Sequence, residues 1–191
     1  MIAGVVLAAG AGTRFGASGS KLLAEFRGRP LVEHAIAAMT AVPELERVVV
    51  VLGSRSDQVR AAVDFGRAEP VVCADWEAGQ SASLRCGLAV LAEADRVIVT
   101  LGDEPALTPA VISRFLEQPD GARAVYDGRP GHPVVLGREL LAAVRGLRGD
   151  EGARSLLQGG PQIECSDLCR PHDVDTLQDL EAIRREARAV V

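Results

Sequence analysis

The residues with the clearest chemistry stand near the amino end, in the stretch GVVLAAGAGTRFGASGSK from Gly4 to Lys21. A short apolar run ends there at small residues and glycines, and two cations follow, Arg14 and Lys21. Glycines at the end of a buried strand let the backbone approach a ligand, with several N–H groups turned towards it. Phosphate suits such amides best, and an arginine and a lysine supply its countercharge. The stretch therefore predicts a loop that binds a nucleoside triphosphate.

Three other kinds of loop share some of these features. A Walker loop ends in Gly-Lys-Ser/Thr, and here Leu22 follows Lys21, so that motif is absent. A dinucleotide loop fits Gly10-x-Gly12 better, but it needs an acidic residue roughly 20 positions later, at the end of the next strand. The next apolar run ends without an acid, although Arg55 after it would suit the 2′-phosphate of NADP. The dinucleotide loop and a plain solvated glycine-rich turn both stay open.

A carboxylate follows a second apolar run, in the sequence Leu101-Gly102-Asp103-Glu104-Pro105. Asp103 stands at the carboxyl end of the predicted strand, where ligands bind in parallel sheets. Mg²⁺ keeps several waters and takes one or two carboxylates together with substrate phosphates, so Asp103 suits a magnesium site. Gly-Asp-x-Pro is also a good turn in which the aspartate binds its own backbone, and this alternative stays open. Glu104 is expected to face away and to be solvated.

A second candidate metal ligand, Asp175, precedes the predicted terminal helix. Thr176 and Asp179 form a T-x-x-D capping box that predicts where this helix begins. Held just before the cap, Asp175 would complete a metal site with Asp103. Its alternative role is that of a negative charge stabilising a helix N-terminus.

A glycine and two serines, Gly79, Ser81 and Ser83, open another predicted helix and present N–H groups and hydroxyls. Ser81 is expected to cap this helix. Trp76 just before it is expected to pack, with stacking on a flat ligand as the alternative.

Length and composition restrict the class of protein. The 191 residues suffice for one domain, residues 1–191, that buries about 70% of its unfolded surface. The net charge of −5 argues against nucleic acid or an anionic membrane as a partner. The chain shows no signal peptide and no apolar run near the ~20 residues of a membrane span, so a cytoplasmic location is expected. The four cysteines lack C-x-x-C spacing, which leaves a zinc site unsupported.

Short apolar runs alternate with helical stretches along the chain. Runs that are apolar at consecutive positions predict central strands covered on both faces. The alternation predicts a three-layer, Rossmann-like α/β sandwich with a mostly parallel sheet, whose carboxyl edge gathers the loops after Leu7, Cys73 and Leu101. The predicted strands are Ile2–Ala8, Arg47–Leu52, Pro70–Cys73, Arg96–Leu101 and Ala122–Tyr126. The predicted helices are Leu31–Thr40, Ser56–Val63, Ser81–Ala92 and Thr108–Glu117.

Together these stretches resemble the nucleotidyltransferase family that includes the cytidylyltransferases and guanylyltransferases of the molybdenum cofactor, the MobA-like NTP transferases. The resemblance covers essentially the whole chain, and Ala9 favours the cytidylyl branch because the guanylyl branch usually has a glycine there. The motifs that carry it are Leu7-Ala8-Ala9-Gly10-x-Gly12-x-Arg14-x-Gly16, Lys21-Leu22-Leu23, Gly79-x-Ser81-x-Ser83-Leu84-Arg85-x-Gly87-Leu88, Gly102-Asp103-x-Pro105, Gly131-His132-Pro133-Val134, Gly149-Asp150-x-Gly152-Ala153-Arg154 and Asp173-x-Asp175-Thr176.

The resemblance implies a fold of the nucleotide-diphospho-sugar transferase type and transfer of CMP from CTP to the phosphate of molybdopterin, with release of pyrophosphate. It further implies Mg²⁺ as cofactor and, as a partner, a molybdoenzyme of the xanthine dehydrogenase type. By the same resemblance Arg14, Lys21 and Asp103 are catalytic, and Asp103 with Asp175 hold the metal. The implied nucleotide-binding residues are Leu7, Ala8, Ala9, Gly10, Gly12, Arg14, Lys21, Gly79 and Ser83.

The sequence departs from the family pattern at two places. The spacer between Gly16 and Lys21 is one residue longer than expected, and Glu104 replaces the more usual Gln or Met. His132 is expected either to contact the acceptor or to fix the turn before Pro133. Three further functions stay open: transfer to another phosphorylated acceptor or from GTP or ATP, an NADP-dependent reductase, and a non-catalytic chaperone that inserts the cofactor.

Overall fold

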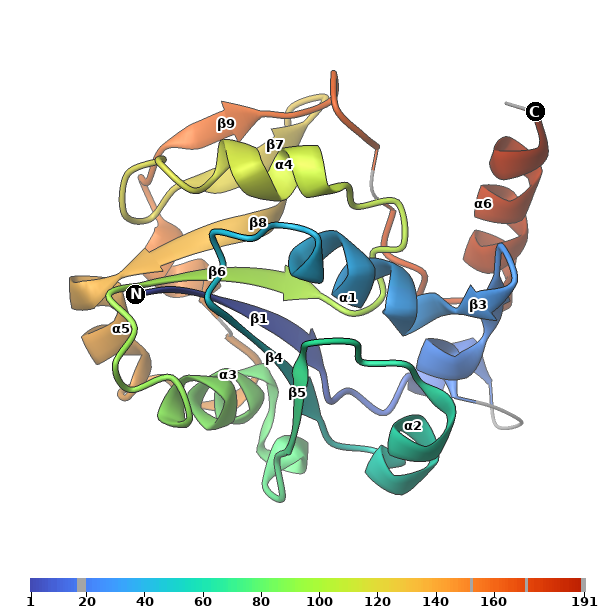
Figure 1. The fold of residues 1–191 in the computed structure, drawn as a ribbon, viewed down its shortest axis with the longest axis horizontal. Helices are drawn as coiled ribbons and strands as arrows, with labels where there is room; N and C mark the ends of the chain where they lie inside the picture. Colours follow the sequence, from blue (N-terminus) through green and yellow to red (C-terminus); the bar gives the residue numbers. More distant parts are fainter. Residues whose placement is uncertain (17–19, 152, 171, 190–191) are drawn as a thin grey trace.

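A sheet of seven strands forms the centre of the protein, with strand order β5-β4-β1-β6-β8-β7-β9 (Figure 1). The computed structural model describes residues 1–16, 20–151, 153–170 and 172–189, so the spacer residues 17–19 and Gly152 of the motifs above lie outside the described residues. The strands are β1 (Ile2–Ala8), β4 (Arg47–Leu52), β5 (Glu69–Val72), β6 (Arg96–Leu101), β7 (Arg123–Tyr126), β8 (Arg129–Gly137) and β9 (Gln162–Glu164), with a separate hairpin of β2 (Glu25–Phe26) and β3 (Arg29–Pro30).

The middle of the sheet is parallel, as predicted. Strand β1 pairs in parallel with β4 and β6, and β4 pairs in parallel with β5. In this register Leu7 lies opposite Val51 on one side and Leu101 on the other, so the carboxyl ends of three strands are level. The loops after them therefore meet at one edge, which confirms the predicted Rossmann-like arrangement.

One long strand, β8, runs antiparallel to both β6 and β7 and was not predicted. Its first half contains Pro130, Gly131 and Pro133, and prolines and glycines are signals of a strand interruption. Only its second half, Val134–Leu136, is buried and apolar.

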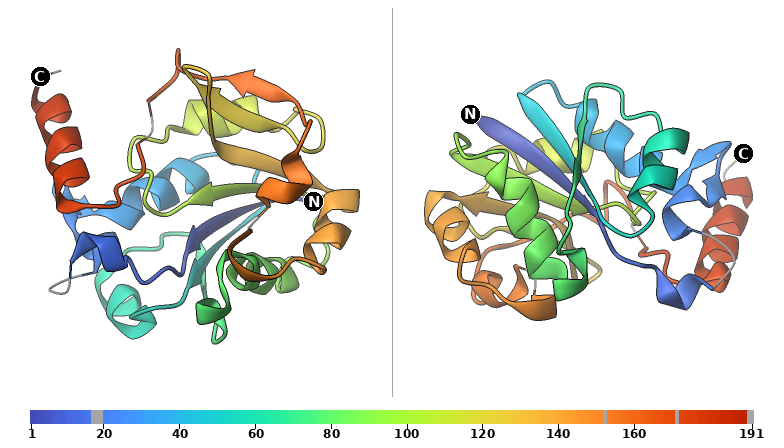
Figure 2. Two further views of the ribbon diagram at one scale, coloured as in Figure 1. Left: turned by 180° about the vertical axis from the view of Figure 1, so that it is seen from behind. Right: turned by 90° about the horizontal axis from the view of Figure 1, so that it is seen from below.

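Helices cover both faces of the sheet (Figures 1 and 2). Strand β1 is apolar at consecutive positions because both of its faces are covered. Val6 packs in the apolar cluster on the α1 and α4 side of the sheet, and its neighbour Val5 packs in the cluster on the α3 side. A Cβ on Gly4 would press on the end of the Met39 side chain of α1, which would have to move aside. The helices are α1 (Leu31–Thr40), α2 (Ser56–Ala62), α3 (Gln80–Ala89), α4 (Pro109–Arg114), α5 (Arg138–Val144) and α6 (Leu177–Ala189). Short 3₁₀ helices are η1 (Thr13–Phe15), η2 (Lys21–Leu23), η3 (Trp76–Ala78), η4 (Gly149–Glu151) and η5 (Arg154–Leu157).

The terminal helix α6 stands beside the β2–β3 hairpin, away from the two helical layers (Figure 1). A small apolar cluster joins it to the amino-terminal part of the chain through Phe15, Phe26, Leu31, Val174, Leu180 and Ile183. This packing brings the start of α6 back to the carboxyl edge of the sheet. Among the described residues, no helix has both the length and the apolar character to cross a membrane.

Candidate active site

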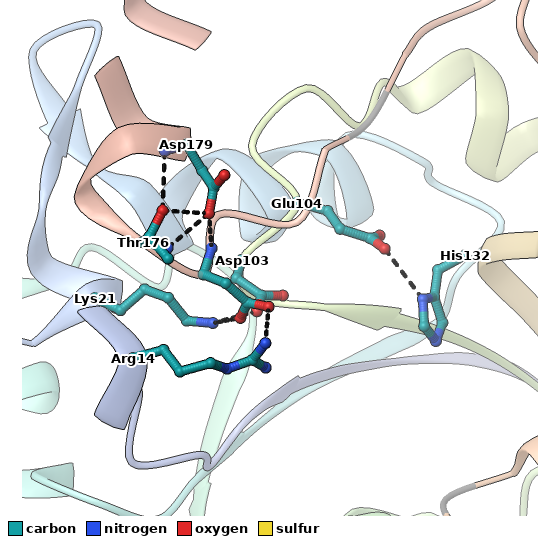
Figure 3. A network of polar contacts seen from close by, with 8 residues as sticks. Arg14, Lys21, Asp103, Glu104, His132, Thr176 and Asp179 are labelled. Carbon is teal, nitrogen blue, oxygen red and sulfur yellow. Dashed lines mark hydrogen bonds and ion pairs between the residues drawn. The ribbon is translucent and has the colours of Figure 1, made fainter. Parts of the chain in front are cut away.

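Lys21 lies between two carboxylates at the carboxyl edge of the sheet (Figure 3). Its Nζ is 2.5 Å from Asp103 Oδ2 and 3.1 Å from Asp175 Oδ1. These two aspartates come from distant parts of the chain, and both contact Lys21. They therefore lie close together, as a shared metal site would require. Whether they hold a metal stays a prediction.

Backbone hydrogen bonds hold both aspartates in place. Gly102 donates its N–H to the carbonyl of Leu7 at 2.9 Å, which fixes the end of β6 beside the glycine-rich loop. Val174 donates its N–H to the carbonyl of Asp103 at 3.0 Å and so places Asp175 next to it. The site is therefore built from the ends of β1 and β6 and the start of α6.

The predicted capping box of α6 is confirmed. Asp179 Oδ2 accepts the Thr176 N–H at 2.7 Å, and Thr176 Oγ1 accepts the Asp179 N–H at 3.2 Å. Asp179 also accepts the N–H of Asp175 at 3.1 Å. The cap thus fixes the backbone of Asp175 and leaves its carboxylate to face the site.

Arg14 approaches the two aspartates from η1, with its Nη1 3.0 Å from Asp175 Oδ2. Its side chain is 75% exposed, whereas that of Lys21 is 12% exposed. An exposed ion pair contributes little to stability, so Arg14 can exchange this partner for a ligand at small cost.

The charges keep Lys21 protonated. Burial lowers the pKa of Lys21, but the adjacent carboxylates of Asp103 and Asp175 outweigh this effect and raise it above its ordinary value. Two carboxylates that already share one cation offer oxygen donors of the kind hard divalent cations prefer. Among the described residues, no group of three or more His, Cys, Asp or Glu side chains is placed to hold a metal ion.

The glycine-rich loop itself begins with buried residues and ends exposed. Ala8 and Ala9 are each 4% exposed, while Gly10 and Ala11 lie at the surface. Ser54 donates its N–H to the carbonyl of Ala9 at 3.0 Å, which ties the loop to the end of β4.

Trp76 packs beside this loop, as predicted. A Cβ on Gly53 would come within 2.5 Å of both Trp76 Cγ and the Ala9 carbonyl oxygen, so only glycine fits between them. The indole thus supports the loop from the neighbouring strand end.

The start of α3 differs from the prediction that Ser81 caps it. The helix begins one residue earlier, at Gln80, whose N–H is 3.3 Å from the Asp150 carboxylate that accepts it. Ser81 is inside the helix and fully buried, and Ser83 is 5% exposed. Gly79 has φ +102 and a Cβ there would meet the Gly149 backbone at 2.5 Å, so this glycine permits η4 to supply the cap. Because the capping carboxylate belongs to a distant part of the chain, the residues around the start of α3 do not reveal it.

A cavity of about 750 Å³ lies over β6, β7 and β8. Glu104, the residue after Asp103, lines it, whereas Arg14, Lys21, Asp103 and Asp175 are not among its lining residues. Its walls combine apolar side chains of the sheet and of α3 with charged residues. The apolar part consists of Leu7, Leu84, Val99, Leu101, Val134 and Leu157. Gln80 and Leu84 of α3 reach it, whereas Ser83 is not among its lining residues.

Glu104 is buried in the wall of this cavity, so the prediction that it is solvated is wrong. It is 2% exposed, and its Oε1 lies 3.1 Å from His132 Nδ1. Figure 3 shows its side chain pointing to His132 and away from Lys21. The chain turns at Gly102 and Asp103, which breaks the alternation on which the prediction relied.

His132 and Asp173, which line the cavity together with Glu104, have shifted pKa values. Burial lowers the pKa of His132, but the negative charge of Glu104 outweighs it and the net shift is upward. Desolvation, together with the charges of Glu104 and Asp103, raises the pKa of Asp173 to about 7. The sequence did not single out Glu104 or Asp173 as site residues, although the departure of Glu104 from the family pattern was a signal.

Comparisons with known proteins show the family of this chain. Residues 4–167 match the MobA-like NTP transferase domain. The nicotine blue oxidoreductase of Paenarthrobacter nicotinovorans is 36% identical over 194 residues, which cover 94% of this chain and 94% of that protein. The bifunctional protein GlmU of Corynebacterium aurimucosum is 42% identical over 150 residues, 73% of this chain but only 30% of GlmU.

Solved structures share the fold over the full length. Rv0371c of Mycobacterium tuberculosis H37Rv superposes with a TM-score of 0.85 at 28% identity, covering 96% of this chain and 97% of that one. A structure of the same protein in complex with manganese has a TM-score of 0.81 at 27% identity, covering 96% and 98%. The nucleotidyl transferase Mth528 of Methanothermobacter thermautotroptrophicus has a TM-score of 0.83 at 25% identity, covering 100% and 99%.

Proposed function

The chain belongs to the MobA-like NTP transferase family, and from this premise we propose that it transfers CMP from CTP to the phosphate of a molybdopterin-type acceptor, releasing pyrophosphate. The observation that carries the proposal is the placement of Lys21 between Asp103 and Asp175, with Arg14 on the outer side of Asp175. This cluster lies beside the glycine-rich loop, because a Cβ on Gly12 would be 3.2 Å from Lys21 Cβ.

In this proposal the protein positions two anions and stabilises charge. The phosphate oxygen of the acceptor attacks the α-phosphorus of CTP, and the bond to the leaving pyrophosphate breaks. Arg14 and Lys21 neutralise the triphosphate and the charge that develops on pyrophosphate. Because the reaction depends on positioning and charge, no protein nucleophile is needed.

Asp103 and Asp175 would hold the divalent ion, which we propose to be Mg²⁺. The manganese complex of Rv0371c supports a divalent ion at this kind of fold. When bound, the ion neutralises phosphate oxygens and helps to orient them. The residues themselves supply two carboxylates that are fixed before any ligand arrives, through the β6 turn and the α6 cap.

The choice of CTP and of the acceptor rests on other features. Ala9 and the block from Gly79 to Leu84 resemble the cytidylyl branch. The cavity beside Asp103 provides room for an acceptor, and His132 lines it. A molybdoenzyme of the xanthine dehydrogenase type would receive the product.

An oxidoreductase is the second candidate, because the relative that matches 94% of both chains is nicotine blue oxidoreductase. In that case the glycine-rich loop would bind the phosphates of NADP. Arg55, exposed at the end of β4, would contact the 2′-phosphate.

Thermal unfolding with CTP, GTP, ATP or NADPH, each with Mg²⁺, tests both candidates. A ligand at 100 times its dissociation constant adds ~2.7 kcal/mol to the free energy of unfolding. We expect a rise in Tm with CTP and release of pyrophosphate when molybdopterin is added. A rise with NADPH and none with any triphosphate would reject nucleotidyl transfer in favour of the oxidoreductase.

A further inference from the structure

A groove of about 940 Å³ lies between the β2–β3 hairpin and the carboxyl-terminal half of α6. Three arginines and one carboxylate line it, in a chain whose net charge is −5. Positive charge is therefore concentrated here against the overall charge of the protein. The lining residues are Glu25, Phe26, Arg27 and Gly28 of the hairpin and Arg184, Ala187 and Arg188 of α6, so the groove shares no residue with the cluster of Arg14, Lys21, Asp103 and Asp175.

The fold brings the three arginines together from two distant segments of the chain, which lie side by side in Figure 1. Arg27 stands in the hairpin turn with φ +48, and its guanidinium carbon lies 5.2 Å from the centre of the Phe26 ring. Arg184 and Arg188 are four residues apart on α6 and so share one face of that helix. Arg184 also donates its Nε–H to the carbonyl oxygen of Glu25 at 3.1 Å, which fixes the helix beside the hairpin.

This arrangement of like charges costs free energy. Cations four residues apart on a helix repel each other, and Arg27 adds a third from across the groove. Within the part of the chain that the structure describes, no carboxylate forms an ion pair with Arg27, Arg184 or Arg188. An anion that contacts all three guanidinium groups would remove the repulsion.

The other walls of the groove restrict what this anion is. A protein partner needs apolar anchors, but Phe26 is 4% exposed and Ala187 is small. A nucleotide base needs a flat face for stacking, and the Phe26 ring is buried against His34 and Arg27. Guanidinium groups bind phosphate oxygens through paired hydrogen bonds. A compact anion with several phosphate oxygens therefore matches the groove better than an acidic peptide or a nucleotide.

We propose that the groove between the hairpin and α6 is a second anion site, which binds a compact inorganic polyphosphate through Arg27, Arg184 and Arg188. The site is separate from the candidate active site and does not depend on nucleotidyl transfer. An anion held here joins the hairpin to α6, whose apolar residues Leu180 and Ile183 already pack with Phe26. Binding should therefore stabilise the position of this helix.

Equilibrium dialysis with radiolabelled pyrophosphate, in EDTA and at low salt, tests the site on the full chain. We expect the unaltered protein to bind pyrophosphate with a dissociation constant of about 1 mM or lower. The Arg14→Ala variant is measured alongside it, because Arg14 belongs to the candidate active site, where a phosphate compound is also expected to bind. Binding in the groove should persist in Arg14→Ala.

Variants of the groove then assign the binding to its arginines. Arg188→Gln and Arg27→Asn, made in the Arg14→Ala background, should each weaken binding about tenfold, the effect of one charge-assisted contact. Asparagine is used at position 27 because it tolerates a positive φ. Arg185→Gln is the matched control and should bind as before, since Arg185 is an exposed arginine of the same helix that does not line the groove.

Absence of binding to the unaltered protein at about ten times the expected dissociation constant would overturn the site without any variant having to fold. Loss of all binding in Arg14→Ala, or equal weakening by Arg188→Gln and Arg185→Gln, would overturn it as well. Tighter, Arg188-dependent binding of poly-glutamate or of CDP would overturn the compact polyphosphate as its occupant. Turnover of CTP does not enter these measurements, so failure of the proposed function would leave their result unchanged.

Discussion

Val174 donates its backbone N–H to the carbonyl oxygen of Asp103 at 3.0 Å, which joins the segment before α6 to the turn after β6. This bond places Asp175 beside Asp103, and Lys21 then contacts both carboxylates. The position of α6 on the β2–β3 hairpin thus determines the geometry of the candidate active site, because Val174 belongs to the apolar cluster beneath that helix.

Arg14→Ala should lower kcat/KM by at least about 10², because a charge-assisted contact to phosphate is lost. Its free energy of unfolding should stay the same, since the side chain is 75% exposed. Steady-state pyrophosphate release and urea unfolding measure the two effects. Arg60→Ala is the matched control, because Arg60 is an exposed arginine on α2 that belongs to neither candidate site. Undiminished turnover in Arg14→Ala would remove this residue from the site.

Lys21→Met should lower the free energy of unfolding by about 1–3 kcal/mol, because it leaves the part-buried carboxylate of Asp103 without a cation and leaves Asp175 with only the exposed Arg14. Added Mg²⁺ should raise the Tm of this variant more than that of the unaltered protein, since the ion takes the place of the ammonium group. Differential scanning fluorimetry with and without Mg²⁺ measures both effects. Lys21→Met combined with Asp175→Asn should lose this extra response; if it is retained, the pair is not the metal site.

Asp103→Asn and Asp175→Asn should each abolish most activity, and the double variant should be hardly worse than either. Residues that act as one unit have non-additive effects. Assays at saturating CTP over a range of Mg²⁺ concentrations measure this. Asp57→Asn, which changes an exposed carboxylate on α2 outside the site, is the control and should keep full activity. If Asp175→Asn were fully active, Asp175 would not be a metal ligand and would only stabilise the N-terminus of α6 by its charge. Asp103 would then be the one carboxylate of this pair that binds the ion.

The sequence predicted the parallel half of the sheet closely, and three strands, Ile2–Ala8, Arg47–Leu52 and Arg96–Leu101, have the predicted bounds. Those strands are apolar at consecutive positions because helices cover both faces, and this signal is local. In the second half of the sheet β7 was predicted within one residue, as Ala122–Tyr126. Strands β8 and β9 were missed, because prolines and glycines interrupt β8 and β9 has only Gln162–Glu164.

The candidate active site likewise has residues that the sequence predicted and residues that it did not. Arg14, Lys21, Asp103 and Asp175 lie in recognisable motifs, and the structure gathers them. The burial of Glu104 and the capping of α3 by Asp150 depend on tertiary contacts, with His132 and with Gln80 respectively. No pattern of neighbouring residues encodes such contacts, so they could not be read from the sequence.

CTP should be turned over faster than GTP or ATP at matched Mg²⁺. This expectation follows from Ala9, which is 4% exposed beneath the loop and resembles the cytidylyl branch. Ala9→Gly should leave folding intact and increase the relative use of GTP, because the guanylyl branch usually has glycine at this position. Competition assays with mixed triphosphates give the ratio of the kcat/KM values. Equal or better turnover with GTP in the unaltered protein would contradict the branch assignment while leaving the family unchanged.

The stability of the fold should fall in mild acid because of His34. Its Nε2 lies 2.8 Å from the carbonyl oxygen of Phe26, and its ring packs edge-on against the Phe26 ring at 5.1 Å. Burial lowers the pKa of His34, and the nearby charges of Arg29 and Arg27 lower it further. The unfolded chain therefore binds a proton more readily than the folded protein, so this contribution is complete above a pH of about 6.5 and is lost as the pH falls through that value.

Urea unfolding at pH 5.5 and 7.5 measures the loss of stability, and His34→Gln, which keeps a donor for the Phe26 carbonyl, should show a smaller loss. The difference between the two proteins cancels the groups that they share, including His132, whose pKa is shifted in the opposite direction. An identical pH dependence in His34→Gln would show that His34 is not the group responsible.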